Sequence, residues 1–138
     1  MNFGIDWSSE FRVLSSECNL FMQTYKELTT WKKSIELTVE IYKITKLLPV
    51  EERFGLISQM NRAVISIPSN IAEGFARCNK KENAYFVNVA YGSALELETQ
   101  IIIIKELGLL EEKELVVVDA LLDEVQKLLY KYRAYLKN

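Results

Sequence analysis

Apolar residues recur at steps of three and four in four stretches of the chain, residues 30–47, 52–77, 80–107 and 111–136. This spacing places side chains on one face of an α-helix, so it predicts four amphipathic helices. Because the loop between the second and third helices is short, these two helices are expected to be antiparallel neighbours. The pattern therefore predicts an all-α fold of four helices joined by short loops.

Local signals mark where the first two helices begin and end. Thr29 or Thr30 is the expected N-cap of the first helix, and Pro49 prevents the chain from continuing that helix. Glu51 and Glu52 suit the positive N-terminal end of the second helix. The first turn is therefore expected at residues 48–51.

The third helix has a start signal and a stop signal. Asn79, with Glu82 three residues later, resembles a capping box, and Gly108 is the expected C-terminal stop. Residues 101–104 are four consecutive isoleucines, which favour a strand locally. The length and period of the surrounding window outweigh this preference and predict helix throughout.

The phase of the apolar residues predicts which side of each helix faces the core. In the first helix the predicted inner positions are Trp31, Ile35, Val39, Tyr42, Leu37, Ile41, Ile44 and Leu48. In the third helix they are Phe86, Val89, Ala90, Ser93, Leu97, Gln100, Ile101 and Ile104. A further set falls outside the core and predicts an exposed apolar surface: Phe75, Tyr85, Val87, Tyr91, Ile102 and Ile103.

The second helix carries a polar stripe beside its apolar one: Arg62, Ser66, Asn70, Glu73 and Arg77. The small side chains of Ser66 and Asn70 lie among long apolar neighbours, so the stripe is expected to be at least partly buried and hydrogen-bonded. Arg62 is expected to pair with one of three carboxylates: Glu73 of another chain, Glu96 or Glu98.

Pro68 lies inside this second helix. Its missing N–H and its ring cost a helix roughly 3 kcal/mol or bend its axis. A bent continuous helix and a break are both open at this point, and the hydroxyls of Ser66 and Ser69 are candidates to bond the carbonyls that the proline frees.

Two segments, PVEERFGLISQMNRAVISIPSNIAEGFAR from Pro49 and AYGSALELETQ from Ala90, resemble a known protein family. It comprises the four-helix bundle proteins encoded by intervening sequences in bacterial 23S ribosomal RNA genes. The accessory variability protein of diversity-generating retroelements is similar. The resemblance implies an up-down-up-down bundle, a ring of five subunits (a homopentamer) and no established catalytic activity.

Composition narrows the possible functions. The 138-residue chain has the length of one domain, and its formal net charge of −2 argues against a broadly basic, nucleic-acid-binding surface. Histidine is absent, which removes Ser-His and Cys-His pairs and the usual di-iron ligands of bundles. We therefore expect no enzyme activity, no cofactor and no metal site.

The two cysteines, Cys18 and Cys78, lie far apart in the sequence and outside any C-x-x-C spacing, so both are expected to be free thiols. No stretch is long and apolar enough for a membrane span, and no signal-peptide pattern is present. The expected location is cytoplasmic, with no membrane partner.

Basic residues gather in two places, which are the candidate nucleic-acid-binding site: Arg77, Lys80, Lys81, Lys127, Lys131, Arg133 and Lys137. Tyr130, Tyr132 and Tyr135 interleave with the second group. Such a composition suits phosphate contacts combined with base stacking. Cations also favour a helix C-terminus, and tyrosines commonly line bundle ends, so a purely structural role stays open.

Residues 1–27 lack a clean period and are predicted to be an N-terminal extension, partly ordered or helical, with the bundle at residues 28–138. The segment that begins at Met22 resembles the usual start of the family. Residues before Met22 are therefore expected to lie upstream of the natural start.

Two functions follow from these observations. The first is a homo-oligomeric interaction scaffold, whose candidate partners are further copies of itself and a nucleic-acid enzyme. The alternative is a protein that binds structured RNA or another nucleic acid through local basic patches.

Overall fold

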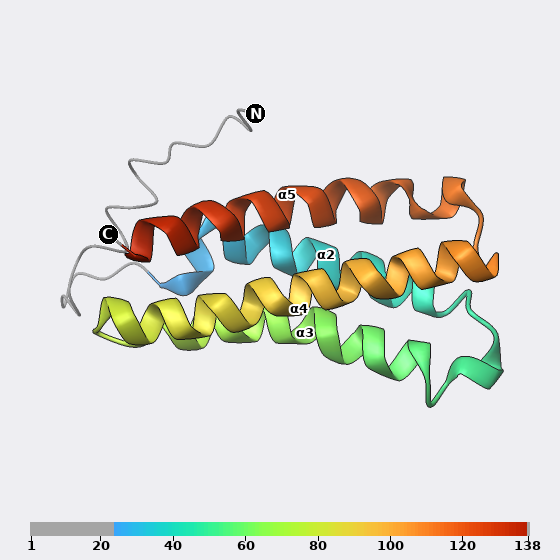
Figure 1. The fold of residues 1–138 in the computed structure, drawn as a ribbon, viewed down its shortest axis with the longest axis horizontal. Helices are drawn as coiled ribbons and strands as arrows, with labels where there is room; N and C mark the ends of the chain where they lie inside the picture. Colours follow the sequence, from blue (N-terminus) through green and yellow to red (C-terminus); the bar gives the residue numbers. More distant parts are fainter. Residues whose placement is uncertain (1–23, 138) are drawn as a thin grey trace.

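The computed structural model describes residues 24–137 and has no strand in that range. Four long helices follow one another: α2 (Thr29–Thr45), α3 (Leu56–Phe75), α4 (Lys80–Leu107) and α5 (Glu112–Lys137). Two short 3-10 helices, η1 (Tyr25–Glu27) and η2 (Val50–Glu52), precede α2 and α3. Consecutive long helices run in opposite directions (Figure 1). The prediction of an all-α chain with four helices is confirmed, and the arrangement agrees with an up-down-up-down bundle.

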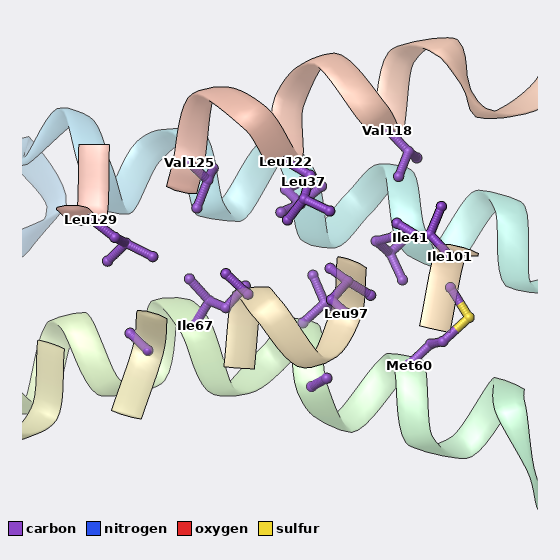
Figure 2. Close-up of a cluster of buried hydrophobic side chains, with 14 of the residues drawn as sticks. Leu37, Ile41, Met60, Ile67, Leu97, Ile101, Val118, Leu122, Val125 and Leu129 are labelled. Carbon is purple, nitrogen blue, oxygen red and sulfur yellow. The ribbon is translucent and has the colours of Figure 1, made fainter. Parts of the chain in front are cut away.

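Each long helix packs against two others, so the four enclose one core. α3 lies against α4, α4 against α5, α5 against α2, and α2 against α3. Figure 2 shows apolar side chains from all four helices pointing into the space between them: Leu37, Ile41, Met60, Ile67, Leu97, Ile101, Val118, Leu122, Val125 and Leu129. Burying such a side chain contributes about 1.5–3 kcal/mol, which makes this core the main source of stability.

The starts of α2 and α3 differ from those predicted. Leu28, which is fully buried, occupies the N-cap of α2 without a side-chain hydrogen bond, so neither Thr29 nor Thr30 is the cap. α3 begins at Leu56 rather than near residue 52, because residues 50–52 form η2. The Glu52 carboxylate still serves α3, since it accepts a hydrogen bond from the Leu56 N–H at 3.3 Å.

The predicted ends of α4 are confirmed. The Asn79 side chain accepts hydrogen bonds from the N–H groups of Lys81 (2.8 Å) and Glu82 (3.2 Å), which are free donors at a helix start. Gly108 has a φ of 66°, the left-handed conformation that ends many helices. The isoleucine run at residues 101–104 is helical throughout.

α3 continues through Pro68 without a break. Because Pro68 has no N–H, the Val64 carbonyl four residues earlier loses its donor within the helix. The Thr38 hydroxyl of α2 lies 3.5 Å from that carbonyl oxygen and 2.8 Å from the Ser34 carbonyl oxygen. A neighbouring helix therefore supplies the hydroxyl near the freed carbonyl, a role that the sequence assigned to Ser66 and Ser69.

The predicted inner face is wrong at several positions. Val87 is fully buried and Val89 is exposed, the reverse of the prediction, and Val39 and Tyr42 of α2 are exposed as well. α4 packs on both α3 and α5, so the direction of these two neighbours sets its buried arc. The spacing of apolar residues gives the period of the helix but not that direction. The buried residues of α4 are Asn83, Val87, Ala90, Ser93, Ala94, Leu97, Gln100, Ile101 and Ile104.

The prediction of a free thiol is wrong at Cys78, which takes part in a disulfide. Distance along the sequence does not decide cysteine pairing, because the fold sets which Cα atoms approach. Cys18 and the rest of residues 1–23 lie outside the described residues, so the predicted N-terminal extension stays a prediction. Within the described range, no helix is long and apolar enough to cross a membrane.

Candidate interaction surfaces of the bundle

The polar stripe of α3 has an inner part that contacts α4. Ser66 and Asn70 are partly buried, and the Ser66 and Ser93 hydroxyl oxygens lie 2.8 Å apart in a hydrogen bond. The Asn70 amide donates to the Ser66 carbonyl oxygen at 2.7 Å and to the Ser66 hydroxyl at 2.9 Å. These bonds satisfy polar groups between packed helices. They also join the two segments that carry the family resemblance.

The outer part of the stripe, Arg62, Glu73 and Arg77, is exposed. The pairing of Arg62 with Glu96 or Glu98 within one chain is wrong, since no ion pair among residues 24–137 includes Arg62. Its helix turns that side chain to solvent. A contact with Glu73 of another chain stays a prediction.

α3 and α4 approach each other closely near Gly74. A Cβ added there would lie 2.6 Å from the Asn83 side-chain oxygen and 3.0 Å from the Phe86 Cβ, so only glycine fits. Asn83 is buried and exchanges hydrogen bonds with the Tyr132 hydroxyl of α5, at 3.3 and 3.4 Å. Sequence reasoning missed Asn83. Its place seven residues before Ala90, a predicted inner position, was the available signal.

The structure brings the two basic groups of the sequence to one end of the bundle. Lys80, at the start of α4, places its ammonium 4.6 Å from the ring centre of Tyr135, near the end of α5. Figure 1 shows the α3–α4 turn and the C-terminal end of α5 at the same end of the molecule. We call this the basic end, formed by Arg77, Lys80, Lys81, Lys131, Arg133 and Lys137.

The three tyrosines that interleave with the C-terminal bases have different environments. Tyr132 is buried and bonds Asn83, while Tyr135 is partly buried and contacts Lys80. Tyr130, in contrast, exposes 57% of its surface. Of the three rings, Tyr130 is therefore the one placed to stack on a ligand.

Tyr130 borders a groove between α4 and α5 with a volume of about 310 Å³. Lys127, in this groove, forms an ion pair with Asp123 at 2.7 Å. The sequence predicted the two lysines and Tyr130 as binding residues. It did not predict that Tyr91 of α4, and Asp123 and Gln126 of α5, line the same groove. The groove is lined by Tyr91, Asp123, Gln126, Lys127, Tyr130 and Lys131.

A second surface is apolar and lies along the outer side of α4. Tyr85 is 63% exposed, and Val89, Leu95, Ile102, Ile103 and Leu107 are exposed on the same helix. Gly92 lies among them, and a Cβ built on it would meet no atom within 4 Å. Because monomeric proteins seldom expose so much apolar area on one helix, this surface has the character of an interface.

The apolar surface matches the predicted one in part. Tyr85, Ile102 and Ile103 are exposed as predicted, whereas Phe75 and Tyr91 are partly buried and Val87 belongs to the core.

Among residues 24–137, no group of three histidine, cysteine, aspartate or glutamate side chains is placed to hold a metal ion.

A comparison with curated proteins finds no match to this chain. The model of one protein family, described as 23S rRNA-intervening sequence protein, matches residues 26–131. That range includes α2, α3, α4 and most of α5, and with them both segments that carried the resemblance. The chain belongs to the 23S rRNA-intervening sequence protein family.

Proposed function

We propose that the protein is a non-enzymatic homo-oligomer, five copies of which close into a ring that acts as an interaction scaffold in the cytoplasm. The observation that carries the proposal is the exposed apolar surface of α4, centred on Tyr85, Gly92 and Ile103. Covering this surface with another copy removes apolar area from water, at about 25 cal/mol per Å².

The second half of the contact is a weaker apolar stripe on α2. Val39 and Tyr42 are exposed there, and Trp31 and Ile35 are partly buried on the same side. A contact between α4 of one copy and α2 of the next joins two different surfaces, so it is heterologous. Such contacts repeat from copy to copy and form a ring when the rotation closes. The family resemblance, and not the exposed area, supplies the number five.

Light scattering in solution tests the oligomer and its size together. We expect five times the mass of one chain, and Ile103→Lys is expected to shift the mass toward one chain, because it places a charge in the apolar contact. Gln59→Lys adds the same single charge at an exposed position of α3 and is the matched control for the added charge. A mass of one chain for the unmodified protein would remove the scaffold proposal.

A second candidate function is RNA binding. It is favoured because the two basic groups of the sequence lie together at the basic end of the bundle. The acidic net charge allows only a local site, and the contact between Lys80 and Tyr135 unites two clusters that are separated in sequence. Phosphate contacts make binding fall steeply with salt. The affinity for a labelled RNA hairpin, measured by titration, is expected to fall between low and moderate salt. The double variant Lys80→Gln/Lys81→Gln is expected to bind the hairpin more weakly still. Absence of binding at low salt would leave the scaffold alone.

A further inference from the structure

The groove beside Tyr130 combines an aromatic wall with positive charge. The Tyr91 and Tyr130 ring centres lie 6.5 Å apart with their planes tilted by 53°. The Arg133 guanidinium contacts both rings, at 4.2 Å from the centre of Tyr91 and 5.7 Å from the centre of Tyr130. These contacts restrict the rings before any ligand arrives, so less rotamer entropy is lost on binding.

The cationic side of the groove comes from one helix. Lys127 and Lys131 are four residues apart on α5, so both side chains emerge on the same face. Asp123 forms an ion pair with Lys127 at 2.7 Å and also lines the groove. The Gln126 amide group donates a hydrogen bond to the Glu98 carboxylate of α4. This bond links α4 and α5 at the base of the groove.

The positive part of the groove is short. It continues into a second hollow of about 190 Å³, which shares Asp123 and Gln126 with the first. Glu98 and Asp119 join Asp123 there, with Lys105 already paired to Asp119 at 2.7 Å. Carboxylates repel a phosphate backbone, so an extended anionic strand cannot follow the groove in this direction.

We propose that the groove between α4 and α5 binds a single unpaired nucleotide of an RNA strand. The base stacks on Tyr130, and its phosphate lies between Lys127 and Lys131. The nucleotide must be unpaired because bases in a duplex present only their edges, whereas a loop or bulge presents the flat face that stacking needs. The inference rests on the RNA-binding candidate and names the site and the form of RNA that it takes.

Fluorescence anisotropy with a labelled ten-nucleotide oligouridine, and with a blunt RNA duplex of the same length, tests the stacking step. The single strand is expected to bind more tightly. Tyr130→Ala should weaken it about tenfold, in line with the loss of one base stack, and Tyr130→Phe should keep the affinity. Phe54→Ala is the matched control, since Phe54 is also an exposed aromatic residue but lies between η2 and α3, outside the groove.

The charged side is tested with the same probe. Lys131→Gln should lower the slope of log affinity against log salt by about 0.7, the value for one phosphate contact on a single strand. Lys113→Gln, on the same helix but at its other end, should not change it. Asp123→Asn should raise the affinity, because it removes the carboxylate beside Lys127. Glu40→Gln controls for the loss of a carboxylate that pairs with another lysine, since Glu40 pairs with Lys43 on α2.

Three results separate the site from the function. If Tyr130→Ala and Phe54→Ala bind the single strand equally well, or if the duplex binds as tightly as the single strand, the nucleotide site is overturned. RNA binding that is lost only in Lys80→Gln/Lys81→Gln would overturn the site and keep the RNA-binding function. No binding by the unmodified protein at low salt would overturn both. Circular dichroism of every variant checks that the helices are intact.

Discussion

The two ends of the bundle are closed by different means. At the basic end, side chains of α3, α4 and α5 hold one another through the Gly74 approach and the Asn83–Tyr132 hydrogen bonds. At the opposite end, which holds the α2–α3 and α4–α5 connections (Figure 1), large apolar side chains remain in solvent. The exposed residues of this apolar end are Leu47, Val50, Phe54 and Leu107.

Charge separates the ends as well. The apolar end carries glutamates at positions 51, 52, 106, 111, 112 and 114, whereas cations dominate the basic end. A cyclic assembly in which the bundle axes are not perpendicular to the symmetry axis would place the same end of every copy on the same face. The ring proposed above would therefore have two unlike faces, one suited to phosphates and one to apolar contacts.

The largest expected effect concerns two adjacent leucines at the apolar end. Leu48 is 6% exposed and belongs to the core, whereas Leu47 is largely in solvent. Leu48→Ala should lower the free energy of unfolding by about 2–3 kcal/mol through lost burial and a cavity. Leu47→Ala should change it by less than about 0.5 kcal/mol. Urea unfolding of both variants measures the difference, and equal losses would show that this end is packed within one chain.

The tight packing of the basic end is tested at Gly74. Gly74→Ala should cost about 1–3 kcal/mol, because the new methyl group would overlap the Asn83 side chain and Phe86. Gly92→Ala is the matched control within a helix, since its methyl group would enter open space. That control should leave the stability of a single chain unchanged or raise it by up to about 1 kcal/mol. A tolerated Gly74→Ala would contradict the close approach.

Backbone geometry at the apolar end predicts a somewhat smaller effect. Gly108 ends α4 with a φ of 66°, a conformation that costs other residues roughly 1–2 kcal/mol. Gly108→Ala should therefore lower the thermal midpoint measurably although the site is open to solvent. Gly108→Asn should lose less, because asparagine tolerates this conformation. No difference between the two variants would argue against backbone strain as the cause.

The smallest expected effect is at the start of α4, at the basic end. Asn79→Ala removes the acceptor for the Lys81 and Glu82 N–H groups and should cost about 1 kcal/mol. Asn79→Ser should recover most of this loss, since serine caps helices comparably well. Circular dichroism during urea unfolding measures both, and a serine variant as weak as the alanine variant would show that the cap is unimportant.

The sequence by itself determined four helices, the ends of α4 and most of the core, because these depend on local caps and on a period that repeats over many residues. It also determined the family, through two segments that meet at the Ser66–Ser93 contact. For the candidate site, the sequence supplied the basic residues and the tyrosines. It could not rank the tyrosines, since Tyr130, Tyr132 and Tyr135 look alike in a periodic pattern.

Only the tertiary structure decided which residues share a surface. The burial of Val87 in place of Val89 depends on the directions of α3 and α5 around α4. The pairing of Lys80 with Tyr135 joins residues that are far apart in sequence. Periodicity is a property of one helix, whereas these contacts depend on the relative positions of several, and the packing of the whole bundle sets those positions.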